Sequence, residues 1–119
     1  MNILIVADKP DMSALWANHL CRNGACVRVV ATGDEAALRL DRELFDVLLL
    51  DTGLTDQNAI DVADYARFRS PDCKVICLTS RTFFSGGDLF DLIPNACAVM
   101  PPHSRPEDLA ALIDYHAGP

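Results

Sequence analysis

Two kinds of hydrophobic pattern alternate along the chain. Short runs made almost wholly of apolar residues are typical of strands that are buried on both faces. Between these runs, apolar residues recur every three or four positions, which is the spacing of a helix with one buried face. The predicted strands are Ile3–Val6, Cys26–Val30, Phe45–Leu50, Val75–Leu78 and Ala98–Met100.

The first and last helical segments each have a predicted buried face. The first is expected at Asp11–Cys21 and should end at Asn23-Gly24, because glycine tolerates a left-handed cap. Its apolar face comprises Met12, Leu15, Trp16 and Leu20. The apolar face of the last helix comprises Leu109, Leu112 and Ile113.

Polar residues mark where helices should begin. Asp34 is a plausible N-cap for the second helix, because a short acidic side chain can accept hydrogen bonds from the first backbone amides. The third helix is predicted at Ala59–Arg69. Ser104 and Glu107 have the spacing of a capping box at the start of the last helix.

This alternation of strands and helices indicates the fold class. Near-continuous apolar strands need cover on both faces, which amphipathic helices between parallel strands provide. We therefore predict an α/β domain with a doubly wound, five-stranded parallel sheet and helices on both faces. The flavodoxin-like strand order 2-1-3-4-5 is the expected arrangement.

Composition narrows the functions that the chain can have. Half of its 119 residues are hydrophobic, its net charge is -7 and its pI is about 4.6. An acidic chain is a poor ligand for nucleic acid or for an anionic membrane surface. It has no apolar run near the roughly 20 residues that cross a bilayer, and it starts without a signal-peptide pattern. We expect a cytoplasmic protein with neither kind of partner.

The five cysteines add no predicted site. Cys73 and Cys77 lie on one predicted strand, where their Cα atoms would be about 13 Å apart, too far for a disulfide. Cys21 and Cys26 flank a glycine turn and could approach each other. For all five, the favoured interpretation is a small buried side chain in a reducing compartment.

Candidate chemistry lies just beyond the predicted strands. In open parallel sheets, ligands bind beyond the carboxyl ends of the strands. Asp8, Asp51 and Thr79 follow the first, third and fourth strands, which would be neighbours. Two carboxylates suit Mg²⁺, and a nearby hydroxyl suits a phosphoryl oxygen, so phosphoryl transfer to a carboxylate fits the set. The alternative is that the aspartates merely end strands.

In their order and spacing, these segments resemble the receiver domains of two-component response regulators. The resemblance covers essentially the whole chain, so we expect residues 1–119 to form one receiver domain, with any output domain beyond Pro119. The matching segments are Ile3 to Pro10, Phe45 to Asp51 with Leu54 beyond it, Val75 to Ser80, and Pro106 to Leu109.

The resemblance implies a role for each matching residue. Asp51 would accept a phosphoryl group from a histidine kinase or a phosphotransfer protein. Asp8 and Asp51 would bind Mg²⁺ through their carboxylates, and Gly53 through its backbone carbonyl. Thr79 would be the switch residue that carries the signal to an output partner or a second copy, through the face of the fourth helix, fifth strand and fifth helix. Such a domain is not an enzyme.

Several positions depart from the family pattern. Ala7 stands where receivers usually have the first of two acids. Strand five usually ends in Lys-Pro, but the only two lysines are Lys9 and Lys74. Met100, Pro101 or Pro102 therefore occupies the lysine position. These degenerate positions should weaken both Mg²⁺ binding and phosphoryl chemistry.

The segment of the usual fourth helix is also unusual. Phe83 to Asn95 contains Gly86-Gly87 and Pro94, which disfavour a regular helix, so we expect it to be irregular or mobile. Its phenylalanines are expected in the core, with an exposed patch for a partner as the alternative.

Three functions are compatible with the sequence. The first is a phosphorylatable receiver with weakened chemistry. The second is a pseudo-receiver that is not phosphorylated and serves as a protein-interaction or dimerisation domain. The third is a small cofactor binder, which is disfavoured because no glycine-rich phosphate loop follows Val6.

Overall fold

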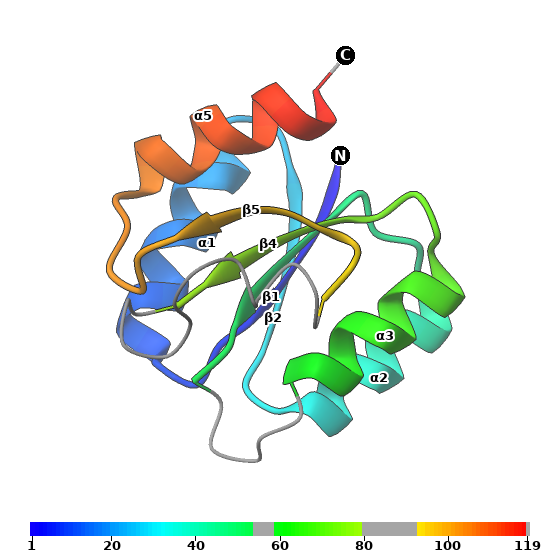
Figure 1. The fold of residues 1–119 in the computed structure, drawn as a ribbon. Coiled ribbons are helices and arrows are strands. Elements are labelled where there is room, and N and C mark those ends of the chain that lie inside the picture. The colour runs from blue at the N-terminus through cyan, green and yellow to red at the C-terminus, as the bar shows by residue number, and fades with distance from the viewer. Residues whose placement is uncertain (54–58, 80–92, 119) are drawn as a thin grey trace.

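The predicted sheet is confirmed in the computed structural model, which describes residues 1–53, 59–79 and 93–118. Its five strands are ordered β2-β1-β3-β4-β5, and every neighbouring pair is parallel (Figure 1). The strands are β1 (Asn2–Val6), β2 (Cys26–Val30), β3 (Val47–Asp51), β4 (Lys74–Leu78) and β5 (Ala96–Met100).

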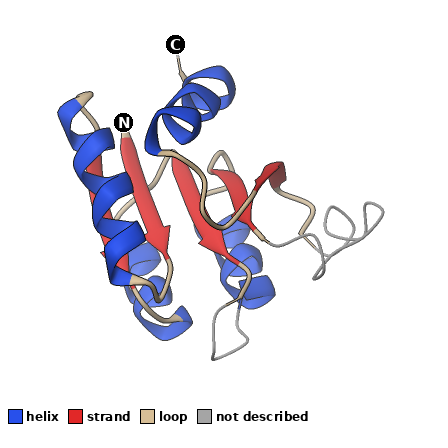
Figure 2. Ribbon diagram, turned by 90° about the vertical axis from the view of Figure 1, so that its left-hand side faces the viewer, coloured by secondary structure: helices blue, strands red, loops and turns tan. Residues whose placement is uncertain are grey.

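Helices cover both faces of this sheet, as predicted. The helices among the described residues are α1 (Pro10–Arg22), α2 (Gly33–Arg42), α3 (Ala59–Arg69) and α5 (Pro106–Ala117). Helices α1 and α5 lie against one face, and α2 and α3 lie against the other (Figures 1 and 2). No helix within the described part of the chain is long and apolar enough to cross a membrane.

Alternation along the strands divides the core into two layers. In β3, Leu48 and Leu50 pack in the layer beneath α2 and α3, while Val47 and Leu49 pack beneath α1 and α5. Every residue of β3 is buried. This two-sided burial explains why the central strands are almost continuously apolar in the sequence.

The predicted apolar face of α1 is right for three residues and wrong for Leu15. Trp16 and Leu20 are buried, and Met12 packs partly against the same core. Leu15 is 54% exposed. One residue turns a helix by about 100°, so Leu15 points well away from the direction of Trp16. The pattern marked an apolar stripe, but neighbouring helices leave one edge of it uncovered.

The predicted N-cap of α2 is also corrected. Thr32, not Asp34, caps the helix: its backbone is extended and its Oγ1 accepts a hydrogen bond of 3.2 Å from the backbone N–H of Glu35. The Thr32 hydroxyl also lies 3.2 Å from the Glu35 carboxylate. Asp34 lies inside the first turn, where its negative charge interacts favourably with the helix dipole.

The predicted capping box at α5 does not form. The N-cap is Arg105, which makes no side-chain cap hydrogen bond. Ser104 instead turns back, and its hydroxyl donates to the carbonyl of Pro101 at 2.6 Å. Leu109 and Ile113 are buried as predicted, and Leu112 packs partly against the core.

The cysteines divide by burial. Burial raises the pKa of the Cys73 and Cys77 thiols to about 12, so both stay protonated and act as small apolar side chains. Cys97 is half-buried. Cys21 and Cys26 are exposed, so the prediction that all five are buried is wrong for these two. Their segments lie at the surface, at the end of α1 and on the edge strand β2.

One buried hydrogen bond joins α1 to the loop between β5 and α5. The indole N–H of Trp16 donates to the carbonyl of Ser104 at 2.8 Å, and the Trp16 side chain is 2% exposed. Residue 104 lies 88 positions further along the chain. The bond therefore fixes the position of the loop relative to the first helix.

Replacing Trp16 with Phe should lower the free energy of unfolding. The variant leaves the buried Ser104 carbonyl without its donor, which costs about 1–3 kcal/mol, and it adds a small packing loss. Urea denaturation followed by circular dichroism measures the change. Tyr115→Phe is the matched control, because Tyr115 is 83% exposed and should shift stability by less than about 0.5 kcal/mol. Equal stabilities for the two variants would contradict the structural role given to this bond.

Candidate functional site

Three of the predicted site residues lie at one end of the sheet, beyond the carboxyl-terminal ends of its strands. Asp51 is the last residue of β3, Asp8 follows β1 after one intervening residue, and Thr79 directly follows β4. Strands β1, β3 and β4 are adjacent and parallel, so their carboxyl termini meet at this end. Asp51 is buried, whereas Asp8 and Thr79 are half-buried.

The turn after β3 holds the Asp51 carboxylate in place. Its Oδ1 accepts a hydrogen bond of 2.8 Å from the backbone N–H of Gly53. A Cβ atom at residue 53 would lie 3.3 Å from that oxygen, so glycine permits this close approach. The backbone N–H and the hydroxyl of Thr52 both reach the carbonyl of Leu78, at 3.1 and 3.3 Å. The turn after Asp51 is thus tied to the end of β4.

Thr52 was not singled out from the sequence. The local sequence does not indicate a role for it, because the hydrogen-bond partner of a threonine that follows a strand cannot be inferred from nearby residues. The partner here, Leu78, is 26 residues away and is brought near only by the pairing of β3 with β4.

The side chains that lie level with Asp51 on the neighbouring strands, and so form one row across the sheet with it, are apolar. Asp51 pairs with Leu78, which pairs with Met100, and Ala7 lies one residue beyond the paired Val6 and Leu50. Ala7, Leu78 and Met100 all belong to or pack against the core layer beneath α1 and α5. Of the three positions considered for the family's lysine, the register therefore places Met100 in the row of Asp51.

Neither lysine replaces the missing ammonium group. Lys74 begins β4 and therefore lies at the opposite end of the strand from Asp51. Lys9 is exposed before α1, and no ion pair within the described residues joins it to Asp8 or Asp51. Thr79 contacts strand five through its backbone, because its N–H donates to the carbonyl of Met100 at 2.9 Å.

The predicted ligand oxygen atoms at this end of the sheet are of a kind that suits a hard cation, but they are few. The ligands predicted from the sequence are the carboxylates of Asp8 and Asp51 and the backbone carbonyl of Gly53, all oxygen donors of the kind that Mg²⁺ takes. Within the described ranges, no cluster of three or more His, Cys, Asp or Glu side chains could hold a metal ion. Two carboxylates and a carbonyl would leave the remaining coordination positions of Mg²⁺ to water.

Part of the predicted signalling face lies outside the described residues. This applies to residues 80–92, which include the three phenylalanines and the two adjacent glycines, and to residues 54–58 after Asp51. The described end of the segment is anchored. Ile93 is fully buried, and the side-chain amide of Asn95 donates to the carbonyl of Ala63 at 3.1 Å.

Comparisons with known proteins identify relatives over most of the chain. The family model described as the response regulator receiver domain matches residues 3–84. The transcriptional regulatory protein TcrA of Mycobacterium tuberculosis is 33% identical over 81 residues, which cover 68% of this chain and 32% of TcrA. The chain thus spans about a third or less of the curated relatives it matches.

Solved receiver structures share the fold. A CheY-like receiver domain from Methanospirillum hungatei has a TM-score of 0.83 and 26% identity, covering 96% of this chain and 90% of its own. TrrA from Thermotoga maritima, solved in complex with Mg²⁺ and BeF, has a TM-score of 0.79 and 22% identity, covering 96% of each chain. With the sheet order and the position of Asp51 established, the family match over more than half of the sequence shows that this chain belongs to the response regulator receiver domains of two-component signalling.

Proposed function

We propose that this domain is a phosphorelay receiver in which Asp51 accepts a phosphoryl group through weakened chemistry. The observation that carries the proposal is the placement of Asp51. Its carboxylate is oriented by the Gly53 amide, at the end of the sheet where Asp8 and Thr79 also lie. If Asp51 merely ended a strand, its role would not require Asp8 and Thr79 beside it.

The chemistry is transfer of a phosphoryl group to a carboxylate oxygen. The hydrogen bond from Gly53 to Oδ1 orients the carboxylate, and one carboxylate oxygen attacks the phosphorus atom. A P–N bond to the phosphohistidine of a kinase or phosphotransfer protein breaks, an acyl phosphate forms, and the departing imidazole takes a proton. Mg²⁺, held by Asp8, Asp51 and the Gly53 carbonyl, would offset charge on the phosphoryl oxygens. Thr79 would then bind one of those oxygens.

The apolar row explains why we propose weakened chemistry. Neither Ala7 nor Met100 offers a charge, and a thioether is only a weak hydrogen-bond acceptor. The developing phosphoryl charge therefore lacks a cationic hydrogen-bond donor from strand five. Hydrogen bonds to charged groups typically contribute about 1.5–3 kcal/mol.

The same row favours a second candidate function. A pseudo-receiver that is not phosphorylated would keep the fold and bind an output partner or a second copy. The surface in question is the one that receivers form from their fourth helix, fifth strand and fifth helix, of which β5 and α5 lie among the described residues. Val99 on β5 and Tyr115 on α5 are exposed there, which suits contact with a protein partner.

Restoring a lysine at Met100 should accelerate phosphorylation of Asp51. At about 1.4 kcal/mol per tenfold, the missing donor corresponds to a roughly ten- to hundredfold difference in rate. Intact mass is followed over time with a small phosphodonor and Mg²⁺, comparing the parent with Met100→Lys and Asp51→Asn. Asp51→Asn should take no label, and the parent should label slowly or not at all.

Val99→Lys is the matched control, because it adds the same charge on the same strand but one residue out of Asp51's row. It should label like the parent. Rapid stoichiometric labelling of the parent would remove the case for weakened chemistry. Labelling of Met100→Lys no faster than that of Val99→Lys would show that the lysine position was assigned wrongly. No labelling of any variant would leave the pseudo-receiver as the supported function.

Mg²⁺ binding by the parent should be weak and should tighten in Ala7→Asp. Two carboxylates give the site less negative charge than three, so we expect little saturation below millimolar Mg²⁺. Ala7 lies beside Asp51 in the row, whereas Ala111 is exposed on α5, which makes Ala111→Asp a control of equal charge. Isothermal titration calorimetry compares the three proteins. Micromolar affinity in the parent, or equal affinities for the two variants, would refute this expectation.

A further inference from the structure

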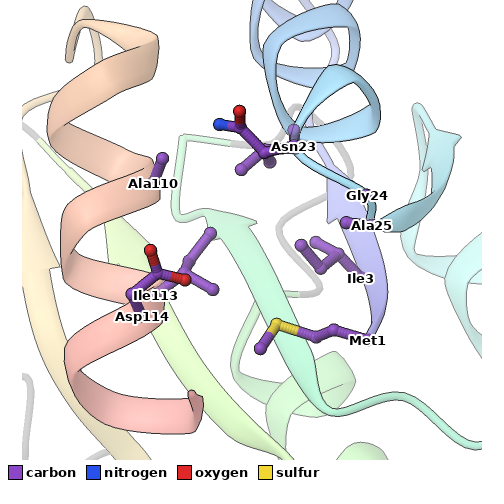
Figure 3. Close-up of a pocket in the computed structure, with 9 residues that line it drawn as sticks. Met1, Ile3, Asn23, Gly24, Ala25, Ala110, Ile113 and Asp114 are labelled. Atoms are coloured by element: carbon purple, nitrogen blue, oxygen red, sulfur yellow. The ribbon is translucent and has the colours of Figure 1, made fainter. Parts of the chain in front are cut away.

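A small pocket lies at the end of the sheet opposite Asp51. It is formed between the start of β1, the last turn of α1 and the second half of α5, and its volume is about 230 Å³ (Figure 3). Pockets that enclose drug-sized ligands usually have volumes of about 300–1,000 Å³. This pocket is therefore of a size for one side chain and not for a cofactor.

The floor of the pocket is apolar. Ile3, Leu20 and Ile113 contribute to it, and all three belong to the core layer beneath α1 and α5. Ala110 adds a small wall on the side of α5 (Figure 3). An occupant with an aliphatic stem would cover this floor and exclude water from it.

Two polar side chains on the rim have no partner within the described part of the chain. Asp114 forms no ion pair or side-chain hydrogen bond there, and the same holds for the side-chain amide of Asn23. Asp114 also lies in the last turn of α5, where a negative charge opposes the helix dipole. The stability of the isolated domain therefore gives no reason for an acid at this position.

The end of α1 adds to the negative potential of the pocket. The helix ends there with Gly24 at a φ of 95°, and the amides of Asn23, Gly24 and Ala25 cap its last carbonyls. The carboxyl end of a helix carries partial negative charge. The Asp114 carboxylate supplies a full negative charge from the facing helix, whereas the positive groups on these elements are Arg22 in the last turn of α1 and the terminal ammonium group of Met1, which also lines the pocket.

We propose that this pocket receives a single lysine or arginine side chain from a protein partner. The aliphatic stem lies on the floor formed by Ile3, Leu20 and Ile113, and the cationic end contacts Asp114 and the Asn23 amide oxygen. Long basic side chains pair an apolar stem with a charged tip in this way. The proposal is independent of phosphorylation, because the pocket and Asp51 lie at opposite ends of the sheet.

The test is an NMR titration of ¹⁵N-labelled protein with two small probes. One is N-acetyl-lysine N-methylamide, and the other is the norleucine analogue, which has an aliphatic stem but no ammonium group. We expect shift changes centred on Leu20, Asn23 and Asp114. At low ionic strength the lysine probe should bind about two- to fivefold more tightly than its analogue, the range that a partly exposed ion pair supplies.

Variants assign that preference to the pocket. Asp114→Asn should abolish it, and Ala110→Leu should fill the space and weaken both probes. Asp61→Asn, which removes an exposed acid on α3, should behave like the parent, as should Asp51→Asn. The proposal is wrong if neither probe perturbs the pocket, if the norleucine probe binds as tightly as the lysine probe, or if Asp114→Asn keeps the full preference.

Discussion

The burial of β3 on both faces is the constraint on which the other features of this domain depend. Four consecutive apolar residues, Val47 to Leu50, alternate between the two core layers, and each buried side chain of this type contributes about 1.5–3 kcal/mol. A slip of one residue would bring a charged residue, Asp46 or Asp51, to the position of a fully buried valine or leucine, so the register is strongly specified. That register also fixes the direction of the next residue, Asp51.

Asp51 inherits its surroundings from this alternation. It points to the same side of the sheet as Leu49, into a row that contains Ala7, Leu78 and Met100. The backbone N–H of Gly53 orients the carboxylate, and Thr52 ties the turn to the end of β4, but the row supplies no second acid and no ammonium group. Geometry suited to phosphoryl transfer is thus combined with a local shortage of charge. This combination is why the proposed function is a receiver with weakened chemistry.

The layer beneath α1 and α5 links the two ends of the molecule. Trp16 ties α1 to the loop after β5, close to Met100 and the prolines that follow it. Leu20, one turn further along α1, forms part of the floor of the pocket at the other end. Packing against a common core gives each end a rigid frame. The two ends differ in chemistry: one carries the Asp51 carboxylate oriented by Gly53, and the other combines apolar surface with the Asp114 carboxylate, which has no ion pair within the described residues.

The sequence by itself determined the strands, the parallel α/β class and the residues that end each strand, because these follow from apolar periodicity and chain order. It also identified Asp8, Asp51 and Thr79 as neighbours, since adjacent parallel strands end at one edge. Tertiary structure decided what depends on distant partners. Leu15 is exposed because no helix in the described part of the chain covers its side of α1, and Ser104 turns toward Pro101 and not into a helix cap. The choice of Met100 among three candidates required the register between β4 and β5, and the pocket beside Asp114 required the packing of α5 against α1. Local patterns report which side chains are apolar, whereas contacts between segments decide which of them are covered.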